Sequence, residues 1–100
     1  MSRYYDRNGE PIDMMTWARS FFENDDAKRV ALTEHDGVSV STVWLGLDHQ
    51  YGDGPPLIFE TMIFGGDHDE YQWRYSTEAE ALVGHEAACR LAFGETEGSK

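Results

Sequence analysis

The side chains best suited to chemistry form two short segments rich in aspartate and histidine. These segments are Asp48-His49 and Asp67-His68-Asp69, and Glu60 lies between them. A metal site needs its ligands to converge within about 2.0–2.2 Å of the ion. Because the two segments fall on successive loops, a meander places them at opposite ends of its sheet. We therefore predict no metal site, and we expect Asp48 to make hydrogen bonds within its own loop.

Serine, threonine and cysteine do not form a pattern typical of nucleophilic catalysis. Ser39, Ser41 and Thr42 lie in an alternating segment without the G-x-S-x-G turn that exposes a catalytic serine. Cys89 is the only cysteine, so an intrachain disulfide is excluded, and its place on an apolar helical face favours a buried structural thiol. The glycines of residues 46–54 open no helix, which argues against a phosphate-binding loop. We predict that the protein is not an enzyme and needs no cofactor.

Two further ionisable residues fall in apolar surroundings. Glu60 lies within the apolar strand run Leu57–Phe64. Its side chain therefore either faces solvent or is buried and paired, with Arg29 and Arg74 as candidate partners. His85 lies beside an apolar helical stripe, where a histidine is either hydrogen-bonded at the edge of the core or a pH-sensitive ligand. We favour a structural role for both.

One long apolar hairpin, residues 38–64, organises the chain around these residues. Val38–Trp44 alternates between two faces, and Leu57–Phe64 is a second run rich in apolar and aromatic residues. Both runs are apolar on both faces near their connecting loop, which predicts central strands covered on each side. The turn Asp36-Gly37 joins the hairpin to an expected first strand, Lys28–Glu34.

The remaining elements are a short hairpin, a helix, an edge strand and a second helix. They are expected at residues 4–12, 14–23, 70–75 and from Ser76 or Thr77 to Gly94. Asn8-Gly9 supplies the first turn, Asp13 is an N-cap, and Thr77 with Glu80 fits a capping box.

This order of elements predicts an α+β fold. We expect an antiparallel three- to four-stranded meander, with a short N-terminal helix and a C-terminal helix packed on the sheet. Residues 1–94 form a single domain in this interpretation, and residues 95–100 have the composition of a disordered tail.

We expect one core to join both helices to the sheet. Its predicted members are Trp17, Val43 or Trp44, Phe59 and Leu82. The apolar stripe of the first helix is Met14, Trp17, Ala18 and Phe21. The buried face of the last helix is expected to hold Leu82, His85, Cys89 and Ala92, flanked by Ala81 and Ala88.

The charge of the chain restricts its partners. With 19 acidic and 8 basic residues, the formal net charge is −11. Such a chain is a poor ligand for nucleic-acid phosphates and for anionic membranes. It has no apolar run of about 18 residues and no signal peptide at its start, so we expect a soluble protein of a reducing cytoplasm. The acidity indicates either a partner with a basic surface or solubility alone.

The loop from Leu47 to Pro56 is longer than a tight turn needs, which is often associated with function. As partner-binding residues we propose Asp48, His49, Tyr51 and Asp53. Trp44 and Tyr51 are candidates for stacking a ligand base. Alternatively, Leu47 and Tyr51 simply cover the end of the core.

Three motifs resemble a family of small proteins encoded by bacteriophages and prophages, notably those of actinobacteria. The motifs are WLGLDH (Trp44–His49), GPPLIFETMIFGG (Gly54–Gly66) and RYSTEAEALVGHE (Arg74–Glu86). YYDRNGEPI (Tyr4–Ile12) and KRVALTE (Lys28–Glu34) fit the same pattern, so the resemblance extends from Tyr4 to about Phe93. It implies a phage accessory protein that acts in the cytoplasm of the infected host, and it transfers no functional residues.

Together these observations indicate an acidic, non-enzymatic binding protein that inhibits a host process, with an anti-phage defence system as the favoured target. The expected partner is a host protein with a basic nucleic-acid-binding surface, rather than nucleic acid or a membrane, and a homo-oligomer is compatible with this interpretation. The first alternative is a protein that sequesters nucleotide signals, and the second is a minor virion or assembly component.

Overall fold

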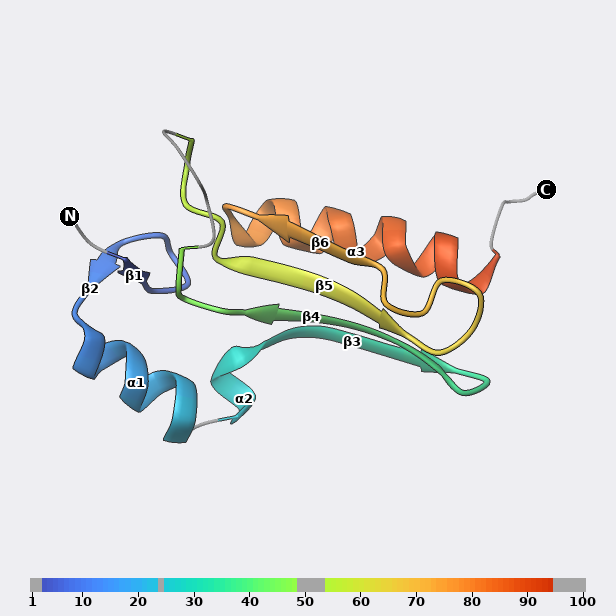
Figure 1. Ribbon diagram of the computed structural model, residues 1–100, viewed down its shortest axis with the longest axis horizontal. Coiled ribbons are helices and arrows are strands. Elements are labelled where there is room, and N and C mark those ends of the chain that lie inside the picture. Colours follow the sequence, from blue (N-terminus) through green and yellow to red (C-terminus); the bar gives the residue numbers. More distant parts are fainter. Residues whose placement is uncertain (1–2, 24, 49–53, 95–100) are drawn as a thin grey trace.

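The computed structural model of the protein describes residues 3–23, 25–48 and 54–94 (Figure 1). Residues 95–100, for which we expect a disordered tail, lie outside this part of the chain. In chain order the elements are β1 (Tyr4–Tyr5), β2 (Pro11–Ile12), α1 (Met14–Glu23), α2 (Asp25–Lys28), β3 (Arg29–His35), β4 (Val38–Trp44), β5 (Phe59–Phe64), β6 (Gln72–Tyr75) and α3 (Glu78–Phe93).

Strands β3 to β6 form one antiparallel meander, in the order β3-β4-β5-β6. Trp44 of β4 lies opposite Phe59 of β5, which lies opposite Tyr75 of β6. The β3–β4 turn is Asp36-Gly37 with φ of 51° and 79°, the left-handed pair of angles that a tight two-residue hairpin requires. The predicted α+β meander with its N-terminal and C-terminal helices is confirmed.

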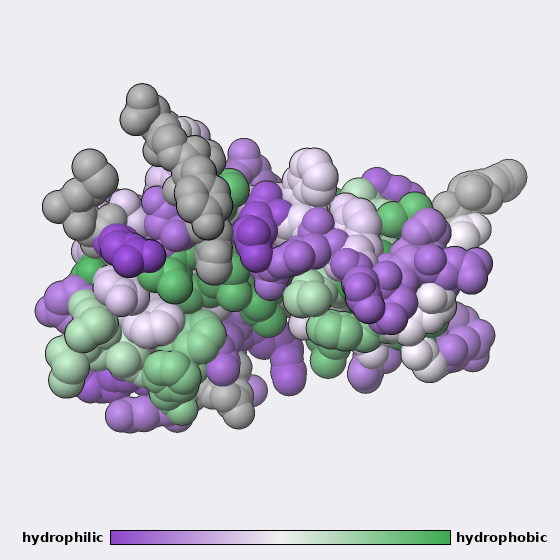
Figure 2. Space-filling model, in the orientation of Figure 1, coloured by the Kyte–Doolittle hydropathy of each residue, from purple (hydrophilic) through white to green (hydrophobic). Residues whose placement is uncertain are grey.

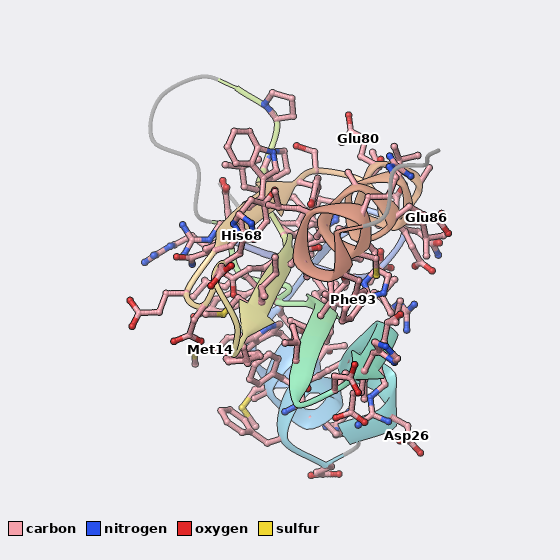
Figure 3. The ribbon with its side chains drawn as sticks, turned by 90° about the vertical axis from the view of Figure 1, so that its right-hand side faces the viewer. Met14, Asp26, His68, Glu80, Glu86 and Phe93 are labelled. Carbon is pink, nitrogen blue, oxygen red and sulfur yellow. The ribbon has the colours of Figure 1, made fainter. Side chains whose placement is uncertain are left out.

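Helix α3 runs along one face of the sheet and forms the core with it (Figure 3). The buried residues of α3 are Ala81, His85 and Ala88. Six strand residues, each at most 2% exposed, form the buried surface of β4 and β5: Val40, Thr42, Trp44, Phe59, Thr61 and Ile63. Their alternation in sequence follows from the twofold period of a strand with one covered face.

The prediction that Leu82 belongs to this core is wrong, because its side chain is 45% exposed. The helix is turned so that Ala81 faces the sheet in its place. Small side chains at Ala81 and Ala88 allow the helix to approach the strands closely, and a leucine on that line would hold it away. The capping box of Thr77 and Glu80 at the start of α3 is confirmed.

Helix α1 packs at one end of the sheet through two tryptophans. The indole of Trp17 donates to the Leu45 carbonyl at 2.9 Å, and that of Trp44 donates to the Tyr5 carbonyl at 3.1 Å. Between the two rings lies Gly46, where an added Cβ would come within 2.5 Å of each indole. A glycine is therefore required for this junction.

The N-cap of α1 is confirmed, since Asp13 Oδ1 accepts a hydrogen bond from the Thr16 amide at 2.7 Å. Hydrogen bonds from the amide and the hydroxyl of Thr16 hold the pKa of Asp13 below its usual value. The predicted apolar stripe is only partly correct. Trp17 and Phe21 are packed against the core, whereas Met14 is 55% exposed.

The sheet face opposite α3 is covered at Glu60, which is 8% exposed, but it is left partly open elsewhere, so the prediction that both central strands are covered on each side is only partly correct. On this face Phe64 of β5 is 48% exposed and Leu32 of β3 is 41% exposed. Figure 2 shows this side of the molecule, with hydrophobic surface over α1 and the middle of the sheet and mostly hydrophilic surface at the right-hand end.

Phe59→Ala removes a large side chain that is fully buried beneath α3. We expect it to lower the free energy of unfolding by about 3–5 kcal/mol, measured by urea denaturation, because it leaves a cavity in the core. Phe64→Ala on the same strand is the matched control and should cost much less, since half of that side chain is already in solvent. Equal losses in the two variants would contradict the assigned burial.

Candidate functional site

Two turns of the sheet meet at the end of the molecule farthest from α1 (Figure 1). They are the β3–β4 turn and the β5–β6 turn, which begins at Gly65. A Cβ on Gly65 would lie 2.7 Å from the Gly37 carbonyl oxygen, so the two backbones touch. The Gly65 amide donates to Asp69 Oδ1 at 2.8 Å, which closes the second turn. Both turns are thus held in defined conformations.

Five exposed carboxylate side chains gather on these turns and on the adjoining end of β3. They are Glu34, Asp36, Asp67, Asp69 and Glu70, and we call this group the acidic end. Within it, Glu34 accepts a hydrogen bond from the Ser39 hydroxyl at 3.2 Å, and Asp36 lies 3.1 Å from His35 Nε2. Exposed contacts of this kind contribute little to stability, so the gathered charge is available to a cationic partner.

Most basic side chains of the described residues lie toward the opposite end. They belong to the N-terminal segment, α1, α2 and the neighbouring ends of β3 and β6: Arg3, Arg7, Arg19, Lys28, Arg29 and Arg74. Arg29 lies opposite Val43, and Arg74 lies opposite Glu60 in the same row of the sheet. Only Arg90, among the described lysines and arginines, belongs to the final turn of α3. The same end also carries carboxylates, among them Asp6, Glu10, Asp13, Glu23 and Asp26. Acidic and basic side chains are therefore mixed there, whereas the two turns of the acidic end carry no lysine or arginine.

The predicted partner-binding loop is described only in part. Asp48 Oδ1 accepts a hydrogen bond from the Leu57 amide at 3.0 Å, and the Asp48 amide donates to the Arg3 carbonyl at 2.9 Å. The expected local hydrogen bonding of Asp48 is confirmed. The other three predicted residues, His49, Tyr51 and Asp53, lie outside the described residues, and their role in partner binding stays a prediction.

Trp44, the second residue expected to stack a ligand, is mainly a core side chain and only 2% exposed. It is nevertheless among the residues that line a surface hollow between α1, α2 and the sheet, together with Phe21, Lys28, Arg29, Ser41 and Val43. Lys28 Nζ lies 4.5 Å from the centre of the Phe21 ring, a cation–π contact at the wall of this hollow. We call it the basic hollow.

Glu60 is buried in a structural pair on the sheet face opposite α3, as predicted. Its side chain is 10% exposed, and Arg74 Nε donates to its Oε2 at 3.1 Å. The Gln72 amide donates to the same oxygen. Two donors on the neighbouring strand therefore compensate for the removal of this carboxylate from water.

A chain of hydroxyl groups, buried at Thr42 and Thr61 and exposed at Thr33, runs from His85 of α3 across the sheet. His85 Nε2 lies 2.9 Å from Thr33 Oγ1, and His85 Nδ1 lies 2.7 Å from Thr42 Oγ1. Thr42 Oγ1 in turn lies 2.6 Å from Thr61 Oγ1, and Thr61 hydrogen-bonds with the Tyr75 hydroxyl. The chain connects α3 to all four strands of the meander. The expected hydrogen-bonded role of His85 is confirmed, whereas its threonine partners were not predicted.

Burial sets the protonation of this chain. It lowers the pKa of His85 below 6.5, because a buried imidazolium loses hydration, and the nearby Glu86 carboxylate opposes this only in part. Burial also raises the pKa of Tyr75, which the hydrogen bond with Thr61 partly offsets. A neutral imidazole has one donor and one acceptor nitrogen. One of Thr33 and Thr42 therefore donates a hydrogen bond to the ring, and the other accepts one from it.

The described residues hold neither a group of metal ligands nor a helix that could span a membrane. Within residues 3–23, 25–48 and 54–94, no three histidine, cysteine, aspartate or glutamate side chains are grouped so as to hold a metal ion. No helix in this part of the chain is long and apolar enough to cross a bilayer. Comparison of the chain with family models, with curated proteins and with solved structures finds no match.

The depressed pKa of His85 predicts a pH dependence of stability. Between its folded and unfolded pKa values the unfolded chain binds the extra proton, so stability falls as the pH drops below about 6.5. His85→Gln keeps a hydrogen-bonding side chain but removes the titration. Urea denaturation at several pH values from 7.5 down to 5 should therefore show a steeper loss of stability in the wild type than in the variant. Parallel curves would contradict the assignment.

Proposed function

We propose that the protein is a phage-encoded, non-enzymatic inhibitor that binds a basic nucleic-acid-binding surface of a host protein in the cytoplasm of the infected cell. Our favoured target is an anti-phage defence system. The observation that carries this proposal is the acidic end, where two segments far apart in sequence bring five carboxylates together. A surface evolved for phosphates attracts such a cluster through the same lysine and arginine side chains.

The rigidity of the two turns adds to this argument. Asp36 sits directly beside Gly37 in a tight turn, and Asp69 is fixed by its hydrogen bond with the Gly65 amide. Carboxylates held on rigid backbone lose little conformational freedom on binding, so more of their attraction to a partner is retained as affinity. At the other end of the molecule carboxylates are mixed with lysine and arginine, so a cationic partner is attracted more strongly to the acidic end.

Neutralisation of the acidic end tests the proposal. The variant Asp36→Asn/Asp67→Asn removes two charges, and asparagine tolerates the left-handed φ of 51° at position 36. We expect tagged wild-type protein to retain a partner from an actinobacterial lysate and to release it to double-stranded DNA or high salt. The variant should bind that partner about tenfold more weakly.

Two control variants make this result specific. Glu10→Gln/Glu23→Gln removes the same number of charges from exposed positions outside the acidic end and should leave binding nearly unchanged. The variant His49→Ala/Tyr51→Ala tests the predicted loop contact, and loss of binding there without loss of thermal stability would move the contact surface to the loop. Capture of no partner, or capture insensitive to salt and DNA, would overturn the proposal.

The basic hollow favours a second candidate function, the sequestration of nucleotide signals. Its wall combines the cations of Lys28 and Arg29 with the ring of Phe21. Cations suit phosphate, and aromatic side chains suit a base. This local arrangement offsets the unfavourable overall charge of −11 for such a ligand.

Calorimetric titration of the full chain with a panel of cyclic nucleotides distinguishes this second function. Binding should be weakened about tenfold by Arg29→Gln and left unchanged by Arg19→Gln, which removes an exposed charge in α1 instead. Absence of heat with every nucleotide would remove the candidate, as would equal effects of the two substitutions.

A further inference from the structure

The outer side of α3 carries a continuous apolar row that the sheet does not cover. Residues spaced by four form it, Ala79, Val83, Ala87 and Leu91, and all four are exposed. Val83 is 70% and Leu91 is 41% exposed. A solvated helix face normally carries polar residues at such positions, because exposed Val and Leu gain nothing from water.

A second row runs parallel to the first, one position over on the helix surface. It consists of Leu82, Glu86 and Arg90, which are also exposed. Rows spaced by four residues are the ridges of a helix, and the space between two ridges is a groove that accepts a ridge of another helix. Ala87 lies in the middle of the first row, where a small side chain allows two helices to cross closely.

We infer that this face of α3 binds the same face of a second copy of the chain, forming a twofold-symmetric dimer with antiparallel helices that cross near Ala87. The argument for this occupant is self-complementarity. When two antiparallel helices face each other about a twofold axis, each flank meets the same flank of its mate in reverse order. Residue 87 then meets itself, and residue 83 meets residue 91 of the second copy.

The charges of the second row agree with this arrangement. Glu86 and Arg90 lie on the same flank, Glu86 one residue before Ala87 and Arg90 three residues after it. In the antiparallel dimer, Glu86 of each copy therefore lies within reach of Arg90 of the other. An isologous contact to which each copy contributes one anion and one cation on the same flank neutralises itself, so Glu86 and Arg90 are not left unpaired in it.

The antiparallel direction also reduces repulsion between two strongly acidic chains. Each acidic end lies near the C-terminal end of α3, where Phe93 contacts His35 of β3 with ring centres 5.8 Å apart. Reversal of one helix relative to the other directs the two acidic ends apart. A parallel pair would bring them together, which costs free energy at short range. The dimer does not depend on the proposed inhibitory function.

Sedimentation velocity on the full chain over a wide concentration range tests the dimer. We expect a monomer–dimer equilibrium, and Val83→Glu should raise its Kd at least about tenfold. Met15→Glu is the matched control: Met15 of α1 is 67% exposed, and the substitution adds the same charge, so the Kd should be unchanged. Circular dichroism verifies that both variants keep their helices.

A charge exchange makes the test specific for orientation. Glu86→Arg sets like charges opposite each other and should weaken the dimer, even though it makes the net charge less negative. The double variant Glu86→Arg/Arg90→Glu restores both opposite pairs and should recover the wild-type Kd. A monomer at every concentration, a dimer that survives Val83→Glu, or no recovery in the double variant would overturn the inference.

Discussion

The close approach of α3 to the sheet is the contact on which the rest of the structure depends. At Gly84 a Cβ would lie 2.1 Å from the Tyr75 hydroxyl oxygen, so the helix and β6 meet where only a glycine fits. The small Ala81 and Ala88 continue this contact, and His85 places its ring between them, hydrogen-bonded to two strands. At this separation a polar ring is sealed from water, so its threonine partners are needed to satisfy it.

The same contact explains which features of the fold follow from the sequence. Turns and caps are local, and Asp36-Gly37, Asp13 and the pair Thr77 and Glu80 were therefore correctly assigned. Which face of α3 packs on the sheet, in contrast, depends on residues far apart in the sequence. Leu82 is more hydrophobic than Ala81, yet Ala81 faces the strands and Leu82 is exposed. The helix lies so close to Tyr75 and to the threonine hydroxyl groups that only its face with small side chains fits against the sheet. Periodicity alone does not distinguish two adjacent helical faces that both contain apolar residues.

The candidate sites show the same division between local and long-range information. Glu60 was assigned a structural pair because a strand pattern predicts burial, and pairing with β6 then selected Arg74 over Arg29. The acidic end was not predicted, although an antiparallel meander already places alternate turns at the same end of its sheet. What only the structure shows is that the two turns, about 30 residues apart in sequence, touch at Gly37 and Gly65. Register brings these segments together: Ser39 of β4 lies opposite Glu34 of β3 on one side and Phe64 of β5 on the other, which places the two turns at the same end of the sheet.

The acidic end is also separated from the contacts that hold the fold. The larger core cluster, with Trp44, Phe59 and Tyr75, lies toward α1, and a smaller cluster of Val40, Ile63 and Ala88 lies beneath the other half of α3. The carboxylates stand beyond this smaller cluster on exposed turns, where their repulsion is screened by solvent and costs little stability. Substitutions at the acidic end therefore leave the core largely unaffected, and a partner surface can change there while α3 keeps its place on the sheet.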